Sequence, residues 1–150
     1  MARILLAKAR YTTLDQSSVV PPLGPMYLAS VLREAGHQVS IYESGYQWRG
    51  LIRFRSALLQ FKPDVLGISA ITFEAKVMEA MADEAKDALP DLPIIVGGPH
   101  PSAYPERCAT HPSIDYAVLG EGEVTCLELV NALTRGGQSP ESVPGLVYAD

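Results

Sequence analysis

The sequence predicts an α/β protein of the flavodoxin-like (Rossmann-like) class, a three-layer sandwich around a five-stranded parallel sheet. Short runs rich in Val, Ile and Leu alternate along the chain with segments in which apolar residues recur at helical spacing. Most of these runs are apolar on both faces, as the strands of a buried parallel sheet must be. Such alternation implies right-handed crossovers. We therefore expect the strand order 2-1-3-4-5, with a switch point between the first and third strands.

Each expected element follows from local patterns. The predicted strands are residues 4–7, 39–42, 65–68, 94–96 and 116–119. The predicted helices are residues 28–35, 51–61, 77–89 and 124–133, with a short one from Pro105. Gly36 ends the first helix because glycine is the usual residue just beyond a helix C-terminus. Pro90 ends the third because proline has no amide hydrogen to continue the helical bonding.

Composition restricts the class of protein. The 150 residues are 47% hydrophobic and 19% charged, which is ordinary for one soluble domain. The net charge of −5 and the absence of a Lys/Arg cluster argue against nucleic acid as a partner. No apolar run approaches the roughly 20 residues of a membrane span. Cys108 and Cys126 form neither a disulfide framework nor a metal-binding spacing, so we expect a reduced, cytoplasmic protein without a metal site. Cys126 lies in a helical pattern and is expected to be a small core residue.

The run Gly97-Gly98-Pro99-His100 directly follows a predicted buried strand. Two glycines at a strand end allow bare backbone to approach something large and flat, and ligands of open parallel sheets sit at this edge. The alternative is a tight turn without a ligand. His100 lies between two prolines and has no metal-binding partner at a recognisable spacing. We expect it to make a hydrogen bond or shape contact near the ligand.

Three other loops at the same edge have unusual residues. The first, residues 8–23, is longer than the usual connection between a strand and the following helix. It is either a flap over a ligand or a mobile surface loop. The third begins Ser69-Ala70-Ile71-Thr72, where Ser69 can donate a hydrogen bond into the crevice and Thr72 can cap the next helix. The fifth is Gly120-Glu121-Gly122-Glu123. Glu123 suits a helix N-terminus, whereas Glu121 is not a usual capping residue.

Several stretches form an ordered set along nearly the whole chain. They are Pro21-Pro22-Leu23-Gly24, Tyr27-Leu28-Ala29, Gly36-His37-Gln38-Val39, residues 62–69, Gly97-Gly98-Pro99-His100-Pro101, residues 116–123 and Pro144-Gly145-Leu146-Val147-Tyr148. This set resembles the N-terminal cobalamin-binding domain of cobalamin-dependent radical S-adenosylmethionine enzymes. The resemblance implies a domain that binds cobalamin, with Ser69-Ala70-Ile71 and Gly97-Gly98 at the positions that receive the nucleotide tail.

The implied cofactor-binding residues come from all four loops. They are Leu14, Gln16, Ser17, Ser18, Ser69, Ala70, Ile71, Thr72, Gly97, Gly98, His100, Pro101, Gly120, Glu121 and Gly122.

One departure from related cobalamin proteins concerns the cobalt. Those that place a histidine on cobalt have an Asp-x-His-x-x-Gly motif after the first strand, where this chain has residues 8–13 and no histidine until His37. The resemblance therefore implies base-off cobalamin without a protein histidine on cobalt. Leu14, Gln16, Ser17 and Ser18 are the residues expected over its lower face.

A second departure concerns the iron–sulfur cluster. Radical S-adenosylmethionine enzymes hold a 4Fe-4S cluster with Cys-x3-Cys-x2-Cys, which the two cysteines of this chain cannot supply. We therefore expect residues 1–138 to be the cobalamin-binding domain and residues 139–150 to begin a linker toward a radical S-adenosylmethionine barrel that is absent here. The parent enzyme would be a methyltransferase or cyclase, and this fragment alone would catalyse nothing.

Two other functions stay open from the residues alone. One is a flavodoxin-like FMN-binding electron-transfer domain, with the phosphate held by the hydroxyl-rich first loop. The other is an interaction module without a ligand, which docks a partner domain through an exposed edge. A receiver-type signalling domain is not favoured, because its acidic residues would stand where this chain has Lys8 and Ser69.

Overall fold

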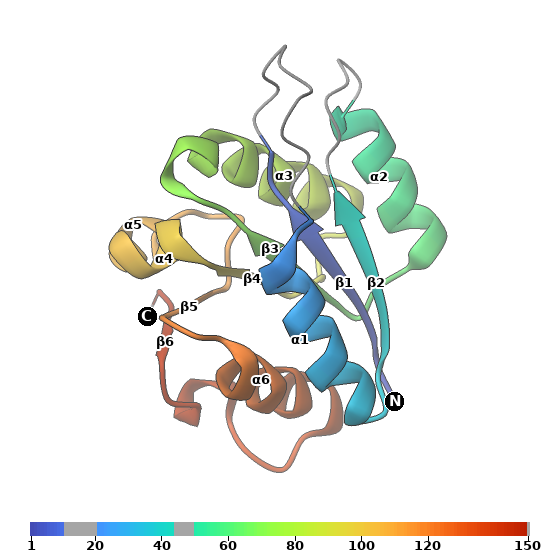
Figure 1. The fold of residues 1–150 in the computed structure, drawn as a ribbon, viewed down its shortest axis with the longest axis vertical. Helices are drawn as coiled ribbons and strands as arrows, with labels where there is room; N and C mark the ends of the chain where they lie inside the picture. The colour runs from blue at the N-terminus through green and yellow to red at the C-terminus, as the bar shows by residue number, and fades with distance from the viewer. Residues whose placement is uncertain (11–20, 44–49, 150) are drawn as a thin grey trace.

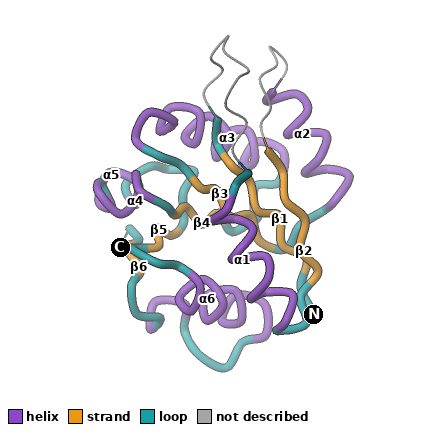
Figure 2. The backbone as a smooth tube through the Cα atoms, in the orientation of Figure 1, coloured by secondary structure: helices purple, strands orange, loops and turns teal. Residues whose placement is uncertain are grey.

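A computed structural model of the chain describes residues 1–10, 21–43 and 50–149. Its centre is a six-stranded sheet in the order β2-β1-β3-β4-β5-β6, with helices on both sides (Figures 1 and 2). The strands are β1 Arg3–Lys8, β2 Gln38–Glu43, β3 Val65–Ser69, β4 Ile94–Gly97, β5 Tyr116–Val118 and β6 Leu146–Val147. The first five are parallel. The flavodoxin-like class and the order 2-1-3-4-5 are therefore confirmed.

The helices alternate with the strands as the apolar spacing predicts. They are α1 Leu23–Glu34, α2 Gly50–Phe61, α3 Ala75–Ala88, α4 Pro99–Ala103, α5 Pro105–Ala109 and α6 Glu123–Arg135, with 3-10 turns η1 Thr72–Glu74 and η2 Pro140–Ser142. The short α4 was not expected. It begins directly after the glycine pair and has Pro99 in its first turn, a position that proline favours.

The sixth strand corrects the prediction of a five-stranded sheet. Leu146 and Val147 pair antiparallel with Val118 and Ala117 of β5. A turn at Gly145 reverses the chain direction, and its backbone φ of 82° is a conformation that glycine adopts without strain. The segment that begins at residue 139 thus contributes an edge strand to the sheet of this domain.

The two faces of the sheet carry separate apolar cores. Alternation along β1 directs Leu5 toward the face covered by α2 and α3, and Leu6 toward the face covered by α1 and α6. The first core includes the fully buried Phe54 and Met78, and the second includes Leu129. Among the described residues, α1 and α6 are the helices that cover the second face, so the spacing between them decides how much of that face stays open.

Polar contacts fix α1 and α6 to each other at the amino edge of the sheet. His37 Nε2 lies 3.1 Å from Asn131 Oδ1, and Arg135 Nη2 donates to the Ala35 carbonyl at 2.9 Å. His37 also accepts a hydrogen bond from the Ala2 amide. These contacts join the helices at one end and leave a gap between them at the carboxyl edge.

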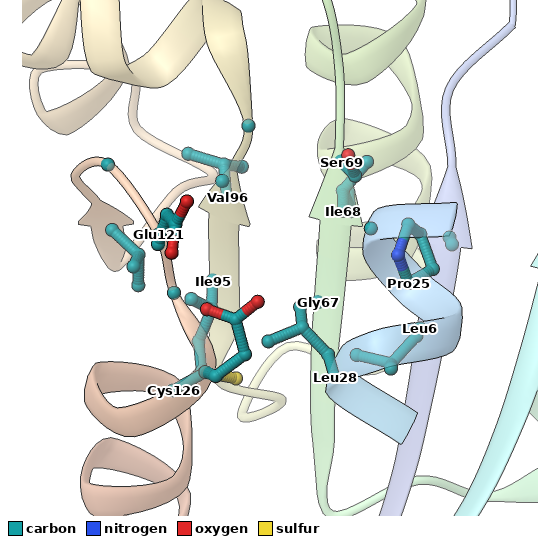
Figure 3. Close-up of a pocket in the computed structure, with 18 residues that line it drawn as sticks. Leu6, Pro25, Leu28, Gly67, Ile68, Ser69, Ile95, Val96, Glu121 and Cys126 are labelled. Atoms are coloured by element: carbon teal, nitrogen blue, oxygen red, sulfur yellow. The ribbon is translucent and has the colours of Figure 1, made fainter. Parts of the chain in front are cut away.

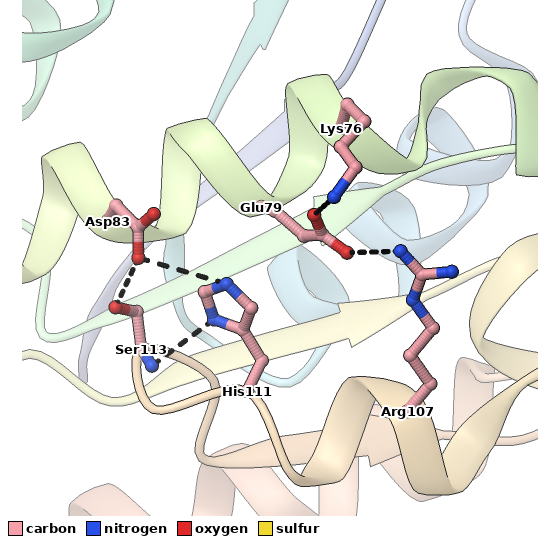
Figure 4. A network of polar contacts seen from close by, with 6 residues as sticks. All are labelled: Lys76, Glu79, Asp83, Arg107, His111 and Ser113. Carbon is pink, nitrogen blue, oxygen red and sulfur yellow. Dashed lines mark hydrogen bonds and ion pairs between the residues drawn. The ribbon is translucent and has the colours of Figure 1, made fainter.

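The opposite face is closed by a polar network between α3 and the α5 region (Figure 4). Glu79 accepts from Lys76 Nζ at 2.8 Å and from Arg107 Nη2 at 3.2 Å. Further along α3, Asp83 accepts from the Ser113 hydroxyl at 2.6 Å. These contacts join α3 to the α5 region on this face. No helix in the ranges that the structure describes is long and apolar enough to cross a membrane.

Stability is expected to fall as pH drops below about 6.5. Burial lowers the pKa of His37 and of His100 from the ordinary value of 6.5. Below that value the unfolded chain binds more protons than the folded chain, so protonation favours unfolding. Urea midpoints should be lower at pH 5.5 than at pH 7.5. In the His100→Leu variant the urea midpoints at pH 5.5 and pH 7.5 should lie closer together. An unchanged difference between these midpoints would contradict a contribution of His100 to the pH dependence of stability.

Candidate cofactor-binding site

A cavity of about 180 Å³ lies at the carboxyl edge of the sheet, in the gap between the first turns of α1 and α6 (Figure 3). Its walls come from β1, β3, β4 and β5 and from the two helices. The residues that line it are Leu6, Ala7, Gly24, Pro25, Leu28, Gly67, Ile68, Ser69, Ile95, Val96, Gly97, Gly98, Val118, Gly120, Glu121, Gly122, Glu123 and Cys126. Aliphatic side chains and glycines predominate, so the cavity suits an apolar, flat group.

Glycines allow close packing of the backbone around the cavity. A Cβ atom on Gly67 would lie 2.9 Å from Leu6 Cδ2, closer than real contacts allow. A Cβ on Gly122 would lie 3.2 Å from Val118 Cγ1, and one on Gly97 would lie 3.9 Å from Val118 Cβ. The strands and the fifth loop therefore line the cavity with bare backbone at these positions. The double glycine after β4 predicted such a backbone surface.

Gly98 has a second, conformational reason to be glycine. Its φ is 100°, a region that side-chain-bearing residues rarely adopt. A Cβ there would lie 3.1 Å from both the Ala70 carbonyl oxygen and Ser69 Oγ. The neighbouring backbone is interlocked, because Ala70 donates to the Gly97 carbonyl at 3.2 Å and His100 donates to the Ala70 carbonyl at 3.1 Å. The third and fourth loops are thus held as one unit.

Polar groups stand at the mouth of the cavity. Ser69 is on the same side of β3 as Gly67, two residues away, and Figure 3 shows its hydroxyl across the opening from the Glu121 carboxylate. In the part of the chain that the structure describes, the Ser69 hydroxyl makes no hydrogen bond. It is available to a ligand, as is the exposed Glu121. Glu123, in the first turn of α6, adds a second carboxylate.

The base of the cavity stays neutral. Cys126 is 5% exposed, and burial raises the pKa of its thiol to about 12. At neutral pH this thiol is uncharged and acts as a small apolar group. Together with Leu28 and Ile95, it gives the cavity an apolar base under a polar mouth. That distribution fits an aromatic ring inserted with its polar attachments outward.

The structure brings six of the predicted site residues together in this cavity: Ser69, Gly97, Gly98, Gly120, Glu121 and Gly122. Ala70 is instead buried in the core on the opposite face of the sheet. Ile71 and Thr72 lie at the start of η1, which the Glu74 carboxylate caps by accepting from the Ile71 amide, so Thr72 is not the cap.

Other predicted residues lie away from the cavity or outside the described ranges. His100 and Pro101 are buried on α4, and the His100 ring packs against Tyr104 with ring centroids 5.3 Å apart. Neither ring nitrogen of His100 has a hydrogen-bond partner in the residues that the structure describes. Leu14, Gln16, Ser17 and Ser18 lie within residues 11–20, outside those described.

None of the three histidines lines the cavity. His37 is buried at the amino edge, His100 faces Tyr104, and His111 lies beside Asp83 in the α5–β5 loop. No cluster of His, Cys, Asp and Glu able to hold a metal ion occurs among the described residues.

Sequence reasoning missed several lining residues, above all Gly67. It lies inside a strand, where a single glycine is easily taken as a packing detail. The available signal was period-two alternation, which puts Gly67 on the same face as Ser69. Gly24 was noticed only as part of the family resemblance, and Pro25 was not noticed at all. Their place in the cavity depends on how α1 crosses the sheet.

A glycine-walled cavity at the carboxyl edge of a doubly wound parallel sheet defines the chain as a cofactor-binding domain. The family follows from sequence. The model of the B12 binding domain family matches residues 12–130, and the chain belongs to this family. The expected resemblance is confirmed, and the match does not favour the alternatives of an FMN carrier or of a module without a ligand.

Known relatives are much longer than this chain. An uncharacterized methyltransferase of Pyrococcus horikoshii is 36% identical over 131 residues, which cover 87% of this chain and 28% of the relative. The anaerobic magnesium-protoporphyrin IX monomethyl ester cyclase of Rubrivivax gelatinosus is 32% identical over 133 residues, covering 86% of this chain and 24% of the relative. The chain thus spans about a quarter of the length of these proteins.

Solved structures share the fold. The radical S-adenosylmethionine methyltransferase TsrM from Kitasatospora setae, with tryptophan substrate and an S-adenosylmethionine analogue bound, superposes with a TM-score of 0.85 at 19% identity. That match covers all of this chain and 29% of TsrM. TsrM with cobalamin and a 4Fe-4S cluster bound gives a TM-score of 0.76 at 20% identity and 27% coverage of TsrM.

Proposed function

We propose that this domain holds cobalamin in the base-off form, with the nucleotide tail in the cavity and no protein histidine on cobalt. The observation that carries the proposal is the cavity itself. Six glycines line it, its base is apolar, and its mouth faces the carboxyl edge of the sheet. All three histidines lie elsewhere, which supports the histidine-free form.

The residues present fit such a tail. Gly67 and Gly97 present bare backbone of the sheet to the flat aromatic ring of the tail. The aliphatic side chains at the bottom of the cavity remove that ring from water. Ser69 can donate and Glu121 can accept a hydrogen bond at the mouth, where the polar sugar of the tail would lie. When bound, cobalamin supplies a cobalt centre suited to methyl transfer. The residues described here bind and orient it.

We further propose that the parent protein is a cobalamin-dependent radical S-adenosylmethionine methyltransferase or cyclase. In it, residues 1–138 form the body of the cobalamin-binding domain, and residues 139–150 add the edge strand β6 and lead toward a barrel with a 4Fe-4S cluster and S-adenosylmethionine. The lengths of the relatives support this, as do large apolar side chains exposed at the carboxyl edge, including Tyr27, Ile71 and Val124. The two free, buried cysteines fit a reducing cytoplasm.

The first experiment compares cobalamin with cobinamide, which lacks the nucleotide tail. In absorbance titrations, cobinamide should bind at least about tenfold more weakly, because burying an aromatic base is worth about 2 kcal/mol. Equal affinities would contradict the placement of the tail. The electron paramagnetic resonance spectrum of the reduced complex should lack nitrogen superhyperfine splitting, and such splitting would contradict the base-off, histidine-free form.

A further inference from the structure

Ser102, a residue of α4 outside the cavity lining, bridges two loops of the site. Its hydroxyl donates to the Gly98 carbonyl at 2.9 Å and accepts from the Gly120 amide at 3.0 Å. Its own amide also donates to the Gly98 carbonyl, at 3.1 Å. One exposed side chain thus connects the loop after β4 with the loop after β5.

This bridge lies where the sheet no longer joins those loops. The ladder between β4 and β5 ends with the pair Val96 and Ala117. Beyond the strands, the hydrogen bonds that join the two loops in the described residues pass through Ser102. Gly120 is directly followed by Glu121 and Gly122, both of which line the cavity.

We infer that Ser102 is a positioning residue that fixes the loop of Gly120, Glu121 and Gly122 against the Gly97-Gly98 loop. It thereby sets the width of the cavity mouth. The inference rests on the proposed function, since the cavity is taken as the cobalamin site. A hydroxyl both donates and accepts at this spacing, whereas alanine does neither. A loop fixed before the ligand arrives loses less conformational entropy on binding.

The exposure of Ser102 separates positioning from folding. In a Ser102→Ala variant, water can satisfy the Gly120 amide, so the free energy of unfolding should change little. The freed loop should still weaken ligand binding. Ser56→Ala is the matched control, because the exposed Ser56 hydroxyl donates to the Ile52 carbonyl at 3.0 Å on α2, away from the cavity.

The test measures amide hydrogen exchange at Gly120 without ligand and the dissociation constant for cobalamin. In Ser102→Ala we expect Gly120 exchange about fivefold faster and cobalamin binding about three- to tenfold weaker, with the thermal midpoint nearly unchanged. Ser102→Thr keeps the hydroxyl, so its Gly120 exchange rate and its dissociation constant for cobalamin should match those of the wild type. Ser56→Ala should alter neither.

Distinct results would overturn distinct claims. Unchanged Gly120 exchange in Ser102→Ala would show that the bridge does not hold the loop, and faster exchange with unchanged affinity would show that the held loop does not serve binding. Either result overturns the inference alone. A wild-type domain that does not bind cobalamin would overturn the proposed function and the inference with it.

Discussion

Replacement of Gly97 by leucine is expected to weaken cobalamin binding severely and to leave the fold intact. Gly97 is the last residue of β4, and alternation puts it on the same face as Ile95, toward the cavity. Its φ is not positive, and a Cβ atom there would meet Val118 Cβ at an ordinary 3.9 Å. The rest of the leucine side chain would then occupy the space assigned to the nucleotide tail.

The measurement is a cobalamin titration beside thermal unfolding. Affinity should fall by about a hundredfold or more, which corresponds to about 2.7 kcal/mol of binding free energy, with little change in the thermal midpoint. Gly50→Leu is the control, because no atom of the described residues lies within 4 Å of a Cβ at this first residue of α2. Undiminished affinity in Gly97→Leu would refute the placement of the tail between β3 and β4.

Gly97 and Gly98 have different structural roles, which the sequence does not distinguish. In the sequence the two glycines look equivalent, and either could be the one that faces a ligand. The structure separates them, because a side chain on Gly98 would be strained by its φ of 100° and directed at Ala70 and Ser69. Substitution there would therefore perturb the fold as well as the site. A backbone angle of this kind depends on the turn into α4, which local pattern does not reveal.

The alternation of strands and helices could be predicted because each element is long enough to show a period. β6 could not. Its two residues, Leu146 and Val147, are too few to show alternation, and their antiparallel pairing depends on the turn at Gly145 and on the open edge of β5. Such an edge is known only once the order of the other strands is known.

The site was predictable as a meeting of loops and not as a set of side chains. The carboxyl ends of parallel strands share one edge, so Ser69, Gly97 and Glu121 were expected together, and the structure brings them together. His100 follows Gly98 closely in sequence, yet its ring turns away because α4 begins at Pro99 and directs it toward Tyr104. Burial of that kind depends on tertiary packing.

Loss of the Glu74 carboxylate is expected to cost about 3 kcal/mol of the free energy of unfolding. Glu74 forms an ion pair with Lys8 at the end of β1, and the two side chains are only 9% and 14% exposed. Glu74 also accepts from the Ile71 amide at 3.1 Å. Removing one partner of a buried pair removes an attraction that acts in a low-dielectric environment, which is far more costly than losing a surface pair.

Urea denaturation of Glu74→Gln measures this cost, with the exposed Glu34→Gln on α1 as a control that should change stability by less than about 0.5 kcal/mol. The double variant Lys8→Met with Glu74→Leu should regain much of the loss, because apolar residues of similar size can replace a buried pair. A loss below about 1 kcal/mol in Glu74→Gln would show that water already screens the pair.

The same pair has a consequence for the site, because it joins the first and third loops. Lys8 ends β1, Glu74 caps η1, and the Ala9 amide donates to the Ser69 carbonyl at 2.9 Å beside them. Glu74→Gln should therefore weaken cobalamin binding in addition to lowering stability, through a looser Ser69. If stability falls while affinity in the folded domain is unchanged, the pair maintains the fold alone and the position of Ser69 depends on β3.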